Sequence, residues 1–149
     1  MTDVENVSAH SVKAWLLAIR PKTFGVAVAP VLASLAVCLS DTGFINPVTA
    51  ALTALLAIVM QAITNMENDS GYTKRKAERT NRKGLPRATS LGLLSIKEVE
   101  IGILIASLIG VAITIYFIYL THWFFLLVTV ASIAAAYLYM GGPRPIAYT

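Results

Sequence analysis

Four polar side chains follow the second apolar stretch of the sequence at the spacing of one helix face. They are Asn65, Asn68, Asp69 and Tyr72, at positions i, i+3, i+4 and i+7. Carboxylate and amide oxygens are the hard ligands that Mg²⁺ takes, and Mg²⁺ often binds through the phosphates of a substrate. Such groups are costly at the end of a membrane helix that faces its neighbours, and they tend to be functional there. The alternative is a helix end that emerges among lipid headgroups, where the same side chains are simply solvated.

The chain becomes strongly basic directly after this face. The cations are Lys74, Arg75, Lys76, Arg79, Arg82, Lys83 and Arg87. A carboxylate and amides facing guanidinium and ammonium groups suit a metal-bridged diphosphate, because arginine binds phosphate oxygens bidentately. The simpler interpretation is that the run follows the positive-inside rule or attracts anionic lipids.

Composition indicates that these residues belong to a membrane protein. Hydrophobic residues make up 56% of the 149 residues and charged residues only 13%. Soluble domains usually have about 45–50% apolar and about 25% charged residues. Too little polar surface is left to cover a soluble globule. The same figures exclude intrinsic disorder, and the single cysteine, Cys38, excludes a disulfide scaffold.

We expect an all-α, polytopic protein with four transmembrane helices. The expected spans are residues 23–40, 47–64, 101–120 and 123–140. Each can cross a hydrocarbon core of about 30 Å, which takes roughly 17–25 residues. Residues 65–100 form a basic loop, and 1–22 form a polar lead. Within that lead, Val12 to Ile19 resembles an interfacial amphipathic helix that Trp15 anchors in the headgroups.

The basic residues predict the orientation of these helices. Three lysines and arginines precede the first span, eight lie between the second and third, and one follows the fourth. All twelve therefore fall on one side of the membrane, which the positive-inside rule makes cytoplasmic. We expect a multi-pass protein of the inner (cytoplasmic) membrane with both termini in the cytoplasm. The polar lead argues against a cleaved signal peptide.

Small residues recur every four positions in the third span, at Gly102, Ala106 and Gly110. This small-xxx-small pattern lets two membrane helices approach closely. We interpret it as a packing seam between helices, with lining of a substrate site as the alternative.

Four short motifs occur in order at the ends of the expected helices. They are Ala18-Ile19-Arg20-Pro21-Lys22-Thr23, the pattern of Asn65 with Asn68-Asp69, the pattern of Gly84-Leu85-Pro86-Arg87-Ala88-Thr89 with Gly92, and the pattern of Tyr137 and Tyr139 with Gly142-Pro143. In this order and placement the chain resembles the first half of the UbiA-type intramembrane aromatic prenyltransferases. The resemblance is closest to the menaquinone branch, the 1,4-dihydroxy-2-naphthoate polyprenyltransferases.

The resemblance implies a ring of about nine helices that moves a polyprenyl chain from its diphosphate onto an aromatic quinone precursor. In that family, Mg²⁺ on two Asp-rich motifs binds the diphosphate, an allylic cation forms, and the aromatic ring attacks it. Carried onto this sequence, the catalytic residues would be Asn65, Asp69 and Tyr139, with Tyr139 facing the cation. The metal ligands would be Asn65, Asn68 and Asp69. The diphosphate-binding residues would be Arg87, Arg79, Arg82, Lys22 and Arg20.

Two departures from the family pattern predict that this chain is inactive alone. The second acid of the first motif falls on Tyr72 and the third on Lys76, and a phenol remains protonated at neutral pH. No acid follows Glu100, so the second Asp-rich motif is absent from this sequence. We therefore expect a truncated or degenerate N-terminal half, a fragment that needs a partner chain to supply the rest.

The alternative is a non-catalytic four-helix membrane protein, either a small transporter or a lipid- or protein-docking module. A transporter normally carries an ionisable residue within a span. The four expected spans contain no Asp, Glu, Lys, Arg or His. The expected partners are a polyprenyl diphosphate, an aromatic acceptor and the bilayer, with no nucleic acid.

Overall fold

The structure, a computed structural model, is built of helices. It describes residues 7–76, 86–120, 123–140 and 146. The elements are α1 (Val12–Ile19), η1 (Pro21–Thr23), α2 (Phe24–Thr42), α3 (Pro47–Lys74), α4 (Ile96–Leu120) and α5 (Phe124–Met140). The described part of the chain contains no strand. The expected all-α class is confirmed.

Three stretches are long and apolar enough to cross a membrane. They are Val12–Thr42, which includes α1, η1 and α2, then Pro47–Lys74 and Ile96–Leu120. The fourth apolar helix, α5, has 17 residues and rises about 26 Å at about 1.5 Å per residue. That is the lower limit for a span. Helix α3 is longer than the expected span, because the polar residues after Thr64 continue the same helix to Lys74.

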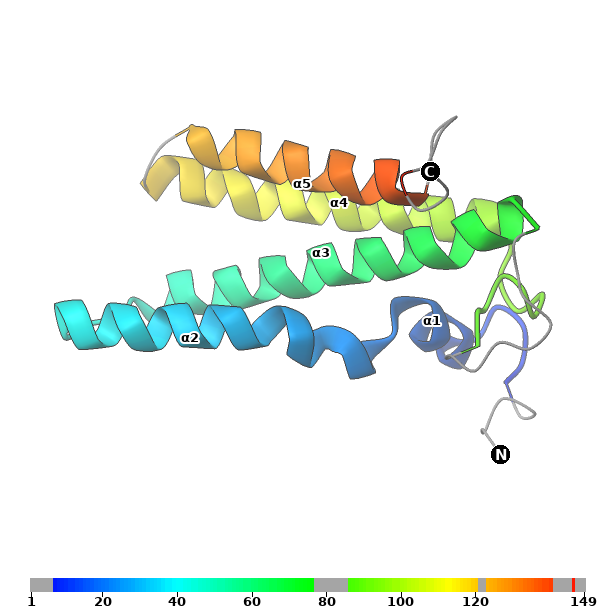
Figure 1. Ribbon diagram of the computed structural model, residues 1–149, viewed down its shortest axis with the longest axis horizontal. Coiled ribbons are helices and arrows are strands. Elements are labelled where there is room, and N and C mark those ends of the chain that lie inside the picture. The colour runs from blue at the N-terminus through cyan, green and yellow to red at the C-terminus, as the bar shows by residue number, and fades with distance from the viewer. Residues whose placement is uncertain (1–6, 77–85, 121–122, 141–145, 147–149) are drawn as a thin grey trace.

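The four long helices run alternately up and down (Figure 1). Helix α3 is central and packs against α1, α2, α4 and α5, while α4 and α5 also pack against each other. The end of α3, the start of α4, the end of α5 and α1 gather at one end of the bundle (Figure 1). We call this the basic end, because Lys13, Lys74, Arg87 and Lys97 belong to the segments there. The end of α2, the start of α3, the end of α4 and the start of α5 lie at the opposite end (Figure 1).

Local sequence signals explain where the helices begin and end. Arg20 ends α1 in the left-handed region at φ 56°, and Pro21 then begins η1. Proline suits a first helical turn, where its missing N–H would have no intrahelical acceptor. Asn46 caps α3, since its Oδ1 accepts hydrogen bonds from the N–H groups of Val48 and Thr49 at 3.0 and 3.1 Å.

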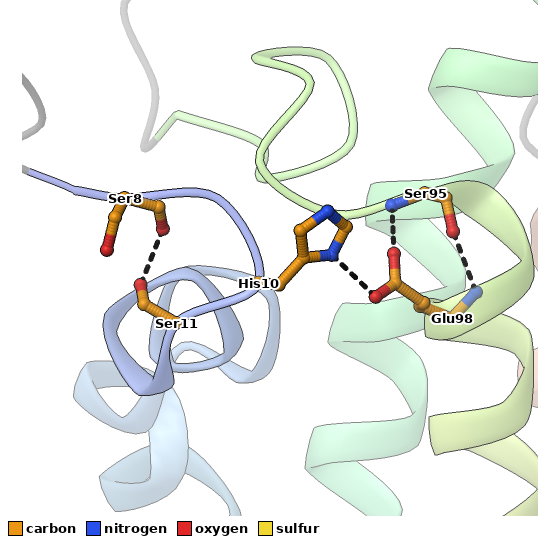
Figure 2. A network of polar contacts seen from close by, with 5 residues as sticks. All are labelled: Ser8, His10, Ser11, Ser95 and Glu98. Atoms are coloured by element: carbon orange, nitrogen blue, oxygen red, sulfur yellow. Dashed lines mark hydrogen bonds and ion pairs between the residues drawn. The ribbon is translucent and has the colours of Figure 1, made fainter.

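Helix α4 begins with a capping box formed by Ser95 and Glu98 (Figure 2). The Glu98 carboxylate accepts from the Ser95 N–H at 2.7 Å, and the Ser95 hydroxyl accepts from the Glu98 N–H at 3.2 Å. His10 lies 2.7 Å from the same carboxylate through Nδ1. Its backbone N–H donates to the Leu93 carbonyl at 2.9 Å. The segment before α1 is therefore fastened to the start of α4.

A buried cluster lies at the basic end and draws on four parts of the chain. Its residues are Ala14, Ala18, Met66, Ala88, Leu94 and Val99. Trp15 of α1 packs against this cluster, and its ring covers Gly102. A Cβ on Gly102 would lie 2.7 Å from the Trp15 ring. Trp15 therefore packs against the bundle, and its role as an anchor in the headgroups stays a prediction.

The small-residue seam of α4 packs against other helices, as predicted. The Trp15 ring packs over Gly102, and a Cβ on Gly110 would lie 3.7 Å from Leu56 and Val59 of α3. Ala106 packs against the buried cluster. The close approach of α1 and α3 to α4 therefore depends on the absence of larger side chains along this line.

A pair of threonines joins α4 and α5 within the apolar part of the bundle. The hydroxyl oxygens of Thr114 and Thr129 lie 2.6 Å apart, and both residues are buried. Thr114 donates its one hydroxyl proton to the Gly110 carbonyl at 2.8 Å. Thr129 is therefore the donor between the two helices. The aromatic rings of Phe117 and Phe125 stack beside them with centroids 5.5 Å apart.

Candidate functional site

Asn65 connects α3 to the turn between α1 and η1. Its amide nitrogen donates to the Ile19 carbonyl at 2.8 Å and lies 2.9 Å from the Thr23 hydroxyl. Its amide oxygen accepts from Gln61 at 3.3 Å. The side chain is buried, so these contacts replace the hydrogen bonds to water that it loses. Asn65 thereby holds the turn that carries Arg20 against α3.

Asp69 lies one turn further along α3 and is completely buried, with 0% of its surface exposed. One carboxylate oxygen accepts from the Ala88 N–H at 2.9 Å, and the other accepts from the Thr89 N–H at 2.9 Å. The Thr89 hydroxyl also lies within hydrogen-bond distance of the carboxylate. An ionised acceptor strengthens such bonds. Asp69 therefore fastens the segment that precedes α4 to the end of α3.

Arg87 and Tyr72 extend this fastening. The Arg87 guanidinium lies 3.6 Å from the centroid of the Tyr72 ring, in a cation–π contact. Arg87 is buried, with 7% of its surface exposed. We call Asp69, Tyr72, Arg87, Ala88 and Thr89 together the Asp69 clasp. The phenol that replaces an acid of the family pattern is thus the surface on which Arg87 stacks.

Three hydroxyl groups complete the contact between α3 and the segment after it. Thr73 lies 2.7 Å from the Thr89 hydroxyl and 2.9 Å from the Ser90 hydroxyl. Lys74, at the end of α3, pairs with Glu100 of α4. These contacts bring together the helix face and the basic segment that the sequence analysis singled out.

The predicted metal ligands do not fit a magnesium ion in this arrangement. Both oxygens of Asp69 accept backbone hydrogen bonds, and its carboxylate is closed to solvent. The Asn65 oxygen accepts from a neighbouring amide, and Asn68 is only half-buried. Across the described residues, no three His, Cys, Asp or Glu side chains form a metal-binding group. Mg²⁺ needs near-octahedral oxygen donors and retained waters, which this closed carboxylate does not offer.

The other predicted site residues are spread along the basic end. Arg20 caps η1 and Lys22 lies within it, whereas Tyr139 lies on α5 with 44% of its surface exposed. Arg79 and Arg82 lie outside the described residues. The structure therefore brings Arg87 to Asp69, and it brings the Arg20 turn to Asn65. The predicted contact of Tyr139 with a cation stays a prediction.

Two pockets at the basic end were not foreseen from the sequence. One has a volume of about 360 Å³ and lies beside α1; its lining includes Lys13, Leu16, Arg20 and Lys22. The other also has about 360 Å³ and lies between α3, α4 and α5. It contains Glu67, which is buried with 7% of its surface exposed. The sequence could have pointed to Glu67, because this residue lies two positions before Asp69 on the helix that continues past Thr64.

The fold and the site define a polytopic helical membrane protein with a polar, basic end closed by side-chain to backbone contacts. It is 29% identical over an alignment of 142 residues to the 1,4-dihydroxy-2-naphthoate octaprenyltransferase of Escherichia coli (strain K12), and the match covers 91% of this chain. The similarity confirms the resemblance to the UbiA-type prenyltransferases. The chain spans about half of that relative, 46% of its length. No family model matches the chain, and no solved structure matches it.

Proposed function

We propose that the chain contributes the N-terminal half of a transferase that moves a polyprenyl chain onto an aromatic quinone precursor, with 1,4-dihydroxy-2-naphthoate as the acceptor in menaquinone biosynthesis. The observation that supports this proposal is the similarity, over 91% of the chain, to a naphthoate octaprenyltransferase. In this reaction the allylic C–O bond breaks and diphosphate leaves with the electron pair. The aromatic carbon bonds to the allylic carbon and then loses its proton.

Arg87 is the proposed principal contact for the diphosphate. It is held at the end of α3 by the Tyr72 ring, so its position is fixed before any ligand arrives. Preorganised cations stabilise the charge that develops on a leaving group. Arg20 and Lys22 approach the same end from the η1 turn, and Arg79 and Arg82 are proposed helpers from outside the described residues.

Asn65 and Asp69 are proposed to frame this end of the site in the closed arrangement. Asn65 sets the turn before Lys22, and Asp69 sets the backbone at Ala88 and Thr89. A role for Asn65, Asn68 and Asp69 as magnesium ligands requires Asp69 to release Ala88 and Thr89 first. Tyr139 is proposed to face the allylic cation through its ring.

The proposed setting is the inner (cytoplasmic) membrane, with the basic end and both termini on the cytoplasmic side. The excess of lysine and arginine at this end supports that orientation. The isoprenoid chain would lie among apolar helices, where water cannot intercept the cation. A second chain, or a further part of the same protein, is proposed to supply the other half of the substrate cavity.

Reconstitution tests this proposal. The full chain in nanodiscs is mixed with octaprenyl diphosphate, dihydroxynaphthoate and Mg²⁺, alone and with a polypeptide covering the unmatched part of the Escherichia coli relative. Prenylated product, measured by chromatography, is expected only when both polypeptides are present. Turnover by this chain alone would refute the need for a second half, and absence of product with both would refute the transfer.

A binding measurement separates transfer from simple docking on lipid. Geranyl diphosphate is titrated into the full chain and into Arg87→Ala, with Arg75→Ala as the matched control because Arg75 is exposed. Loss of charge-assisted hydrogen bonds worth about 1.5–3 kcal/mol predicts roughly 10- to 100-fold weaker binding for Arg87→Ala only. If neither the wild type nor the variants bind the diphosphate, while anionic vesicles bind them all, the docking-module alternative is the better one.

A further inference from the structure

Helix α1 has two opposite faces at the basic end of the bundle. Ala14 and Ala18 form the inner face, and both are completely buried in the cluster shared with α3 and α4. The outer face consists of four residues at positions i, i+3, i+4 and i+7, namely Lys13, Leu16, Leu17 and Arg20. Helix α1 crosses the direction of the long helices (Figure 1). Its outer face therefore combines leucines and cations on the outside of the bundle, at the level of its basic end.

A pocket of about 360 Å³ lies along this outer face. Its walls are mostly apolar, and they come from Leu16 and Leu17 of α1, Pro21 of η1 and Val7 of the segment before α1. The volume falls within the range of about 300–1,000 Å³ that is typical of small-molecule sites. None of the residues of the Asp69 clasp belongs to the described lining. The pocket is therefore separate from Arg87, the proposed principal contact for the diphosphate.

Three cations border this apolar pocket: Lys13, Arg20 and Lys22. Lys13 and Lys22 are exposed, and neither forms an ion pair with a described residue. A lysine side chain can lay its aliphatic stem along an apolar surface and keep its ammonium group in water. No Asp or Glu occurs between residues 7 and 40. The positive charge at the rim of the pocket is therefore not balanced by an acid of α1 or η1.

We propose that this pocket binds an anionic phospholipid from the leaflet at the basic end. Its phosphate lies beside Lys13 and Lys22, and the first part of an acyl chain lies against Leu16 and Leu17. Helices with an apolar and cationic face bind anionic membranes, and basic pockets bind anionic headgroups. A free phosphate would leave the apolar walls in contact with water, which is unfavourable. A zwitterionic lipid would bring its own cation toward the lysines, which repel it.

This inference goes beyond the proposed transfer, because it needs neither a prenyl diphosphate nor a second polypeptide. The test is native mass spectrometry of the full chain, released from nanodiscs made of equal parts of phosphatidylglycerol and phosphatidylcholine with the same acyl chains. A lysine near an anionic headgroup contributes roughly a fivefold preference, so two lysines should enrich phosphatidylglycerol roughly 25-fold in the first lipid retained. Equal retention of the two lipids would overturn the proposal. Displacement of the retained lipid by inorganic phosphate would mean a site for a free anion and would overturn it too.

Variants with matched controls locate the retained lipid. Lys13→Gln should lower the preference for phosphatidylglycerol roughly fivefold. Lys97→Gln makes the same charge change at an exposed lysine of α4 outside the pocket, and it should leave the preference intact. Leu16→Ser should lower retention of both lipids about three- to tenfold, because apolar contact is lost. Leu91→Ser is its control, since Leu91 lies outside the pocket and both leucines are 48% exposed.

Two results with these variants would overturn the site. Equal effects of Lys13→Gln and Lys97→Gln would mean that the whole basic end attracts anionic lipid diffusely. Unchanged retention in Leu16→Ser would mean that the acyl chain does not lie in the pocket. Prenyl transfer is measured in none of these experiments, so failure here and failure of the proposed function are distinguishable.

Discussion

Replacing Asp69 by asparagine should open the segment before α4 while the rest of the bundle stays folded. The carboxylate gives one oxygen to the Ala88 N–H and the other to the Thr89 N–H. An amide has the same shape but only one oxygen, so one backbone N–H would meet an NH₂ group. The variant loses a hydrogen bond to a charged acceptor, worth about 1.5–3 kcal/mol, and leaves a buried donor unsatisfied at about 1–3 kcal/mol.

Together these losses reach about 3 kcal/mol or more, which is roughly a hundredfold in the equilibrium for local opening. Hydrogen–deuterium exchange on the full chain in nanodiscs measures this directly. Amides of residues 86–95 should exchange about a hundredfold faster in Asp69→Asn than in the wild type. Asp41→Asn is the matched control, because Asp41 is exposed at the opposite end of the bundle.

Two results would refute this reasoning. Unchanged exchange of residues 86–95 would mean that the contacts of Asp69 do not hold the segment. Equally accelerated exchange in α5 would mean that Asp69 supports the whole bundle and not one segment. Further slowing of exchange in this segment by Mg²⁺ in the wild type, and not in Asp69→Asn, would instead favour a metal site over the clasp.

Three further perturbations test the helix packing and the orientation. Thr114→Val removes the hydrogen bond between α4 and α5 at nearly constant volume. The free energy of unfolding in denaturing micelles should fall by about 0.6 kcal/mol, and by at most about 1.7 kcal/mol. An unchanged free energy of unfolding would contradict a stabilising role for this bond. Gly102→Ala places a methyl group against the Trp15 ring and should destabilise the protein by about 1–3 kcal/mol, with a red-shifted tryptophan emission because the ring is displaced toward solvent. Unaltered emission would show that the methyl group does not displace the ring. In a Cys38→Ser background, an impermeant maleimide added to intact cells should label Asp41→Cys, and Lys97→Cys only after permeabilisation. The reverse labelling pattern would invert the proposed topology.

The helices were predictable because they depend on properties that each segment carries by itself. An uncharged run of apolar residues predicts α4, and the amphipathic pattern from Val12 to Ile19 predicts α1 with the same bounds that the structure shows. The continuation of α3 past Thr64 followed from the shared face of Asn65 and Asp69. None of these inferences required knowledge of which helix packs on which.

The contacts of the candidate site were less predictable, because Asn65 and Asp69 bind backbone groups. The Ala88 N–H has no signature in the sequence, yet it is a partner of Asp69 across 19 positions. A carboxylate at a helix end suggested a metal ligand, and nothing in its residue type indicated that two amide groups would occupy it. Glu67 escaped notice for a related reason, since only the tertiary arrangement makes its side of α3 an apolar pocket.

The packing of α1 has a consequence for the order of events during synthesis. Its Trp15 docks over Gly102, and His10 meets Glu98 at a separation of 88 residues. The docking surface for α1, part of which α3 supplies, is therefore complete only when the start of α4 has left the ribosome. The first helix to be made must wait at the membrane surface while α2 and α3 insert. A chain arrested before α4 should expose Trp15 to solvent and to proteases, which makes this tryptophan a natural reporter of when the bundle becomes complete.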